Sequence, residues 1–149
     1  MKIKYRKYKN EDKKNVIKLI KRFYTEDPTP KGMSNEKIKK TLAFLPKHKE
    51  RGIILVFDYN KEIIGYSVLI NFWSNEYGGN IIYIDELFVK KEWRRKGIAT
   101  EFITALIKKR INNAIAIQLE VTPNNKNARK LYERLGFIEH KNPQLTKEM

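Results

Sequence analysis

The chain has 149 residues, a formal net charge of +15 and no cysteine. This length predicts one domain with a sizeable core, and the lack of cysteine excludes a disulfide framework and a thiolate nucleophile or ligand. The N-terminus lacks an apolar signal segment and no apolar run is long enough to span a membrane, so we expect one cytoplasmic domain over residues 1–149.

The positive charge comes mainly from lysine, with 24 lysines against 8 arginines. A basic surface is typical of nucleic-acid-binding proteins. Here the lysines are spread along the chain, and no recognition-helix motif or aromatic RNA-binding pattern accompanies them. The abundance of lysine, isoleucine and asparagine is typical of an AT-rich genome. We therefore expect no specific nucleic-acid partner, and only weak, salt-sensitive adhesion to polyanions.

The first part of the chain predicts a strand followed by two helices. Ile3 to Tyr8 alternate in the manner of a strand. Asn10 has a side chain suited to cap the first helix, whose first turn is acidic. After a loop rich in proline and glycine, Ser34 can cap a second helix that ends at Pro46.

The rest of the chain predicts strands that alternate with helices. Residues 53–58 and 62–72 form a hairpin, and a turn leads into a third strand over residues 81–89. A helix then begins near Ile98, a strand covers residues 114–121, and a last helix and strand follow. The order β-α-α-β-β-β-α-β-α-β predicts an α/β fold with a mixed, mostly antiparallel sheet and helices on both faces.

The loop after the third strand of this series has the composition of a phosphate site. It contains Arg94-x-x-Gly97-x-Ala99 directly before the helix, with Arg95 and Lys96 adding positive charge. The first N–H groups of a helix lack partners, and the helix dipole is positive there. A basic turn that begins a helix by chance has the same composition, so this loop alone leaves both interpretations open.

A second motif lies near the C-terminus, where the sequence from Asn125 to Phe137 follows the pattern Asn-x-x-Ala-x-x-Leu-Tyr-x-x-x-Gly-Phe. Together, the strand, the Arg-x-x-Gly-x-Ala loop and this motif resemble the GNAT superfamily of acyl-CoA-dependent N-acetyltransferases over essentially the whole chain. The resemblance implies a GNAT-like single domain with a splayed pair of central strands, and acetyl-CoA as the co-substrate.

The resemblance also implies which residues contact acetyl-CoA. Its pantetheine would pair with the backbone of one strand segment, and its pyrophosphate would rest on the amides that follow. Asn125 can cap its helix, contact the cofactor, or do both. The implied residues are Leu87, Phe88, Val89, Arg94, Arg95, Lys96, Gly97, Ile98, Ala99, Thr100 and Asn125.

Three side chains are candidates for the chemistry. By resemblance, Tyr132 protonates or hydrogen-bonds the departing thiolate, whereas an ordinary role would be a core aromatic. An alkyl ammonium must lose a proton before it attacks. The resemblance implies that Asp85, four residues before Val89, holds the cation and relays that proton through water. Glu86 points to the opposite face of the strand and is the second candidate. For either carboxylate, a salt bridge to a lysine is the structural alternative.

The acceptor site is implied to lie between the first two helices and the loop after the strand over residues 62–72. Aromatic and acidic side chains in these segments suit a cation with an alkyl body, namely Phe23, Tyr24, Trp73, Glu76 and Tyr77. His48 and His140 have no metal-ligand spacing, so we expect no metal site.

The expected function is transfer of an acetyl group from acetyl-CoA to a primary amine of a small molecule or a protein, by direct attack in a ternary complex. Many members of the superfamily are dimers, so a homodimer is among the expected states. The alternative is a non-catalytic acyl-CoA-binding or basic nucleic-acid-binding module on the same fold. The sequence does not identify the amine.

Overall fold

A computed structural model describes all residues from 1 to 149. Five strands form one sheet in the order β1-β2-β3-β4-β5, where only β4 and β5 are parallel. The strands are β1 (Lys4–Lys7), β2 (Gly52–Tyr59), β3 (Glu62–Ser74), β4 (Gly79–Val89) and β5 (Ala116–Leu119). The helices are α1 (Lys13–Glu26), α2 (Asn35–Phe44), α3 (Ile98–Lys109) and α4 (Lys126–Arg134). No helix combines the length and hydropathy needed to cross a bilayer.

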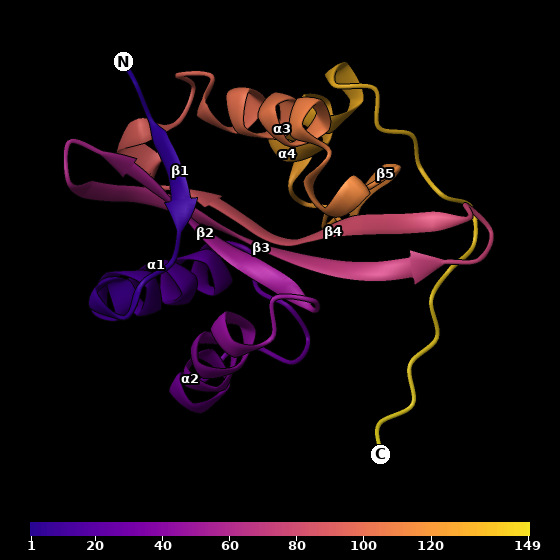
Figure 1. The fold of residues 1–149 in the computed structure, drawn as a ribbon, viewed down its shortest axis with the longest axis horizontal. Helices are drawn as coiled ribbons and strands as arrows, with labels where there is room; N and C mark the ends of the chain where they lie inside the picture. Colours follow the sequence, from indigo (N-terminus) through magenta and orange to yellow (C-terminus); the bar gives the residue numbers. More distant parts are fainter.

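The sheet lies between two helical layers, as Figure 1 shows: α1 and α2 cover one face, and α3 and α4 cover the other. Side chains alternate along a strand, so β2 contributes Val56 to the core beneath α1 and α2, and Phe57 to the core beneath α3. The predicted α/β fold, with a mixed, mostly antiparallel sheet and helices on both faces, is confirmed.

Local signals located some helix ends and missed others. Ser34 caps α2 by accepting a hydrogen bond from the Lys37 amide at 3.2 Å, as predicted. Asn10 does not cap α1; it begins a short 3-10 turn, Asn10–Asp12. Asp12 occupies the N-cap position of α1, where its side chain accepts from no helix amide; its carboxylate instead accepts from the Lys9 amide at 2.8 Å while it pairs with Arg6. The predicted cap was therefore wrong by two residues.

The strand predicted after α4 does not form. Gly136 ends α4 with a φ of +88°, but the residues that follow pair with no strand. The physical reason is composition: Pro143 has no N–H to donate, and this segment offers few apolar side chains to bury. Ile138 and Leu145 remain 86% and 96% exposed. β5 is therefore an edge strand, and it is shorter than the predicted 114–121.

The two parallel strands separate halfway along β4. Residues Ile81 to Ile84 pair with β5, whereas β4 continues to Val89 after β5 has ended at Leu119. A bulge lies at the same point: Val68 is opposite Glu86 and Leu69 is opposite Ile84, so Asp85 is the extra residue. Beyond the bulge, β4 pairs only with β3, and its other edge is open. This is the splayed arrangement that the resemblance implied.

Candidate functional site

A cleft of about 730 Å³ opens where β4 leaves β5. Its walls come from the end of α1, the end of β4, the start of α3 and most of α4. The predicted cofactor residues that line it are Leu87, Phe88, Val89, Arg94, Arg95, Gly97, Ile98, Ala99, Thr100 and Asn125. Lys96 is the exception: it does not line the cleft, and its ammonium lies 4.9 Å from the centre of the ring of Trp93, which does. Tyr132 also lines the cleft.

The start of α3 presents backbone amides to this cleft. Gly97 precedes the helix with a φ of +78°, and Arg95 also has a positive φ of +60°. No side chain caps the helix, and its first backbone bond runs from the Glu101 amide to the Gly97 carbonyl. The amides of Ile98 to Thr100 therefore lack helical acceptors, which is the arrangement that binds anions. A Cβ on Gly97 would meet nothing within 4 Å, so its backbone conformation, and not crowding, favours glycine there.

Arg94 links two walls of the cleft. Its Nε donates to the Val89 carbonyl at 2.8 Å, and its guanidinium forms an ion pair with Glu26 at the end of α1. The same guanidinium lies 5.3 Å from the centre of the Phe88 ring. The next residue of the chain after Glu26, Asp27, accepts a hydrogen bond from the Thr122 hydroxyl at 2.7 Å. The end of α1 thus contacts the segments that follow both separated strands.

α4 carries the two C-terminal motif residues. Asn125 caps the helix, because its side-chain oxygen accepts from the Ala128 amide at 3.2 Å. Tyr132 lies about two helical turns later, with its ring 5.7 Å from that of Phe137. Burial, and then the charge of Asp27, raise the pKa of Tyr132 to about 12. Its hydroxyl therefore keeps its proton at neutral pH and can donate it in a hydrogen bond.

Glu86 is a buried carboxylate on the α1 face of the sheet, with 6% of its surface exposed. The Tyr66 hydroxyl donates to it at 3.2 Å. Burial, and then the neighbouring charge of Asp85, raise the pKa of Glu86 to about 7, while hydrogen bonds from Tyr66 and Tyr24 partly oppose that shift. Glu86 consequently titrates near neutral pH, which is the range useful to a general base.

Asp85 is more accessible than Glu86. It is the exposed bulge residue, although enough protein surrounds its carboxyl for desolvation, and then the charge of Glu120, to raise its pKa. Neither carboxylate forms a salt bridge, so the lysine pairing considered as a structural role is absent. The two side chains therefore give β4 a buried and an accessible carboxylate in succession.

The residues considered for the acceptor divide into two groups. Phe23 lines the cleft and packs edge-on against Tyr24, whose pKa is raised by burial and by the charges of Glu86 and Asp85. Trp73, by contrast, is 71% exposed at the far end of β3. Glu76 and Tyr77 lie in the turn that follows it, roughly 20 Å or more along β4 from Asp85.

Sequence patterns did not reveal several residues that shape this site. Tyr66 is an ordinary apolar-strand residue by pattern, and its contact with Glu86 depends on the register between β3 and β4. Glu26 and Asp27 end a helix far along the chain from their partners. The only local signal is that two acids stand at the C-terminal end of α1, where the helix dipole disfavours them.

The sequence matches the family model of the acetyltransferase (GNAT) family over residues 14–137. No curated protein matches it. A possible acetyltransferase from Clostridium difficile 630 is similar in structure, with 23% identity, a TM-score of 0.85, and coverage of 99% of this chain and 97% of that chain.

Two solved structures with CoA ligands also match. AAC(6')-Iy in complex with the bisubstrate analogue CoA-S-monomethyl-acetylneamine has 14% identity, a TM-score of 0.80, and coverage of 100% of this chain and 99% of that chain. A predicted acetyltransferase with acetyl-CoA from Clostridium acetobutylicum has 18% identity, a TM-score of 0.79, and coverage of 98% and 96%. At these identities, the structural likenesses show a shared fold.

Proposed function

Because the chain belongs to the GNAT acetyltransferase family, we propose that it moves the acetyl group of acetyl-CoA to a primary amine of a small molecule or protein, by direct attack in a ternary complex. One observation carries this proposal: a single cleft combines the uncapped start of α3, the open edge of β4 and Tyr132. We take residues 1–149 as one domain of this kind.

Acetyl-CoA would be held mainly by backbone groups. The amides at the start of α3 suit its pyrophosphate, and charged hydrogen bonds of this type contribute roughly 1.5–3 kcal/mol each. The open edge of Leu87 to Val89 suits the amide groups of pantetheine, as in an added strand. The Arg94 guanidinium donates a hydrogen bond to the Val89 carbonyl. We expect it to release this carbonyl and to contact the cofactor when acetyl-CoA binds.

The amine needs a base, and Glu86 is better suited to this role than Asp85. An alkyl ammonium has a pKa near ~10.4, so its deprotonation at pH 7 costs roughly 4–5 kcal/mol. A carboxylate with a pKa near neutrality accepts that proton more readily than an ordinary one. Asp85 is accessible and close enough to Glu120 for their charges to interact, and we assign it the attraction of the cationic acceptor.

The chemical step then follows from these roles. Glu86 first accepts one proton of the ammonium and passes it to solvent through water. The free amine nitrogen then attacks the thioester carbonyl carbon, its second proton passes to Glu86 directly or through water, and the carbon–sulfur bond breaks. The sulfur leaves with the bonding electrons, and the products are an N-acetyl amine and CoA. The pKa of Tyr132, about 12, exceeds that of a thiol near ~8.5, so its hydroxyl stabilises the thiolate as a hydrogen-bond donor.

The test is CoA release from acetyl-CoA with a panel of amines: a polyamine, an aminoglycoside, an amino-acid derivative and a lysine-containing peptide. Turnover with at least one amine, slowed by Glu86→Gln and by Tyr132→Phe, supports the proposal. Calorimetry on the same samples measures cofactor binding separately. Tight binding of acetyl-CoA without release on any amine would instead favour the non-catalytic acyl-CoA-binding alternative.

A further inference from the structure

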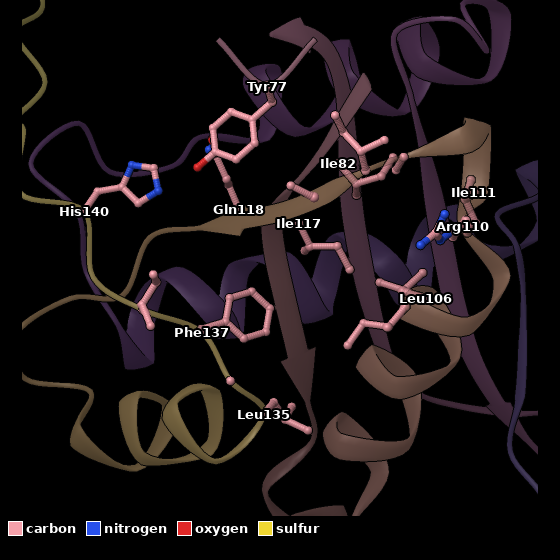
Figure 2. A pocket seen from close by; sticks show the side chains of 16 residues that line it. Tyr77, Ile82, Leu106, Arg110, Ile111, Ile117, Gln118, Leu135, Phe137 and His140 are labelled. Carbon is pink, nitrogen blue, oxygen red and sulfur yellow. The ribbon is translucent and has the colours of Figure 1, made fainter. Parts of the chain in front are cut away.

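A second hollow, of about 340 Å³, follows the outer edge of β5 (Figure 2). Ile117 faces the opposite side of the sheet from Ala116 and Gln118, yet all three line the hollow, so it runs along the edge of the strand. The second half of α3 and the segment from Leu135 to His140 form its other walls. It shares no lining residue with the cleft described above.

The edge of β5 that borders this hollow has no strand partner. β5 pairs only with β4 and ends the sheet, and the chain beyond α4 adds no strand there. Along Ala116–Leu119, the N–H and C=O groups that point outward are therefore free to pair with another backbone. An unpaired edge of this kind is a template for an added strand.

The lining of the hollow indicates what kind of strand fits. Twelve of its sixteen residues are hydrophobic, and Ile107 and Ile115 are each about half exposed there. Arg110 is the one lining residue with a permanent charge, and it forms no salt bridge. No carboxylate lines the hollow. The site therefore offers apolar surface and an unneutralised guanidinium.

The surrounding charges strengthen this preference for an anion. Lys108 and Lys109 precede Arg110 in the last turn of α3. Glu139, next to the lining residue Ile138, is already paired with Arg129 at 3.1 Å. Glu120 directly follows the C-terminal end of β5 and would repel acidic side chains there. We therefore expect the acidic side chains of a bound strand to lie near Arg110.

We propose that the outer edge of β5 binds an extended segment of an acidic partner protein. The backbone of that segment pairs with Ala116–Leu119, an apolar side chain enters the hollow, and a carboxylate meets Arg110. A second copy of this chain, which also carries a net charge of +15, is the competing occupant that the test below distinguishes from an acidic segment.

The test uses two fluorescent five-residue peptides, Glu-Val-Glu-Ile-Glu and Lys-Val-Lys-Ile-Lys, in about 0.15 M salt to screen distant charges. We expect the acidic peptide to bind at least about tenfold more tightly than the basic one, as one charge-assisted contact allows. Arg110→Glu should remove this difference. Lys61→Glu makes the same change of charge in the β2–β3 turn and should keep it.

Backbone pairing has its own readout. The acidic peptide should slow amide exchange in Ala116–Leu119, and an N-methylated version of it should not. Equal binding of both peptides, no binding at millimolar concentration, or equal losses in Arg110→Glu and Lys61→Glu would each overturn the proposal. Self-association that Ile107→Asp abolishes would assign the edge to a second copy and overturn it as well. CoA release should be unchanged in Arg110→Glu, so these outcomes are independent of the proposed acetyltransferase activity.

Discussion

Replacing Glu86 by glutamine should make the protein more stable and less active at alkaline pH. The cause is the burial of its carboxyl, which is 6% exposed and has a pKa raised from 4.5 to about 7. The folded protein holds this proton more tightly than the unfolded chain does. The stability that Glu86 contributes is therefore fully present below about pH 4.5 and is lost as the pH rises through 7.

The size of this loss follows from the shift in pKa. A difference of about 2.5 units, at about 1.36 kcal/mol per unit, corresponds to ~3 kcal/mol at pH 8. Glutamine has almost the same shape, accepts from the Tyr66 hydroxyl and carries no charge to desolvate. Glu86→Gln should thus raise the melting temperature at pH 8 by roughly 6–12 °C in a chain of this length. At pH 4 the difference should nearly vanish.

Thermal unfolding at pH 4 and pH 8, together with CoA release against pH, tests this reasoning. Wild-type kcat/KM should rise as Glu86 loses its proton near pH 7. Glu86→Gln should lower the rate by about 10²–10⁴-fold, and its kcat/KM should show no rise near pH 7. Glu76→Gln is the matched control, since its carboxyl is exposed in the turn between β3 and β4, far from Glu86. A Glu86→Gln protein that melts lower than wild type at pH 8, or that keeps the wild-type rate, would refute the assignment.

Substitutions at four further residues test the rest of the site. Gly97→Asp and Gly97→Asn place similar side chains on the same positive φ, so calorimetry should show CoA binding lost mainly with Asp; equal losses would point to strain instead of charge. Tyr132→Phe should lower kcat by about 10–10³-fold with little change in cofactor affinity, and an unchanged single-turnover rate would leave Tyr132 a core residue. Asp85→Asn should raise KM for the amine more than it lowers kcat, most strongly at low pH; a stability change with normal kinetics would contradict the recognition role. Glu26→Gln should free Arg94 and tighten CoA binding by up to about fivefold, the limit for an exposed ion pair; weaker binding would mean that Glu26 orients Arg94 toward phosphate.

The sequence predicted most of the fold because most of its signals are local. Apolar periodicity located all four helices and the five strands, and Ser34 and Gly136 mark helix ends by their own chemistry. The errors arose where contacts between residues far apart in the sequence determine the structure. The N-cap position of α1 falls at Asp12 and not at Asn10, and Asp12 pairs there with Arg6 from β1. The strand predicted after α4 does not form, because a strand is stabilised by burying apolar side chains and this C-terminal segment has few of them.

The cofactor loop was predictable for the same reason. Which of the two carboxylates, Asp85 or Glu86, is buried was not predictable. A glycine with positive φ and a helix start are properties of a few successive residues. Strand alternation predicts that Asp85 and Glu86 differ in direction, but it does not say which of them is buried. That depends on the bulge in β4 and on Tyr66 across the register, and neither leaves a pattern in the sequence.

The coincidence of the bulge with the end of β5 explains how one strand can serve two substrates. Had alternation continued from Ile84, Glu86 would face α3; the extra residue Asp85 turns it toward α1. At the same point the loss of β5 opens the edge of β4. The backbone from Leu87 to Val89 is thus exposed to a ligand within the sheet, while the carboxylate stands on the α1 face. A thioester lying along the edge and an amine approaching from α1 would meet there without competing for the same groups.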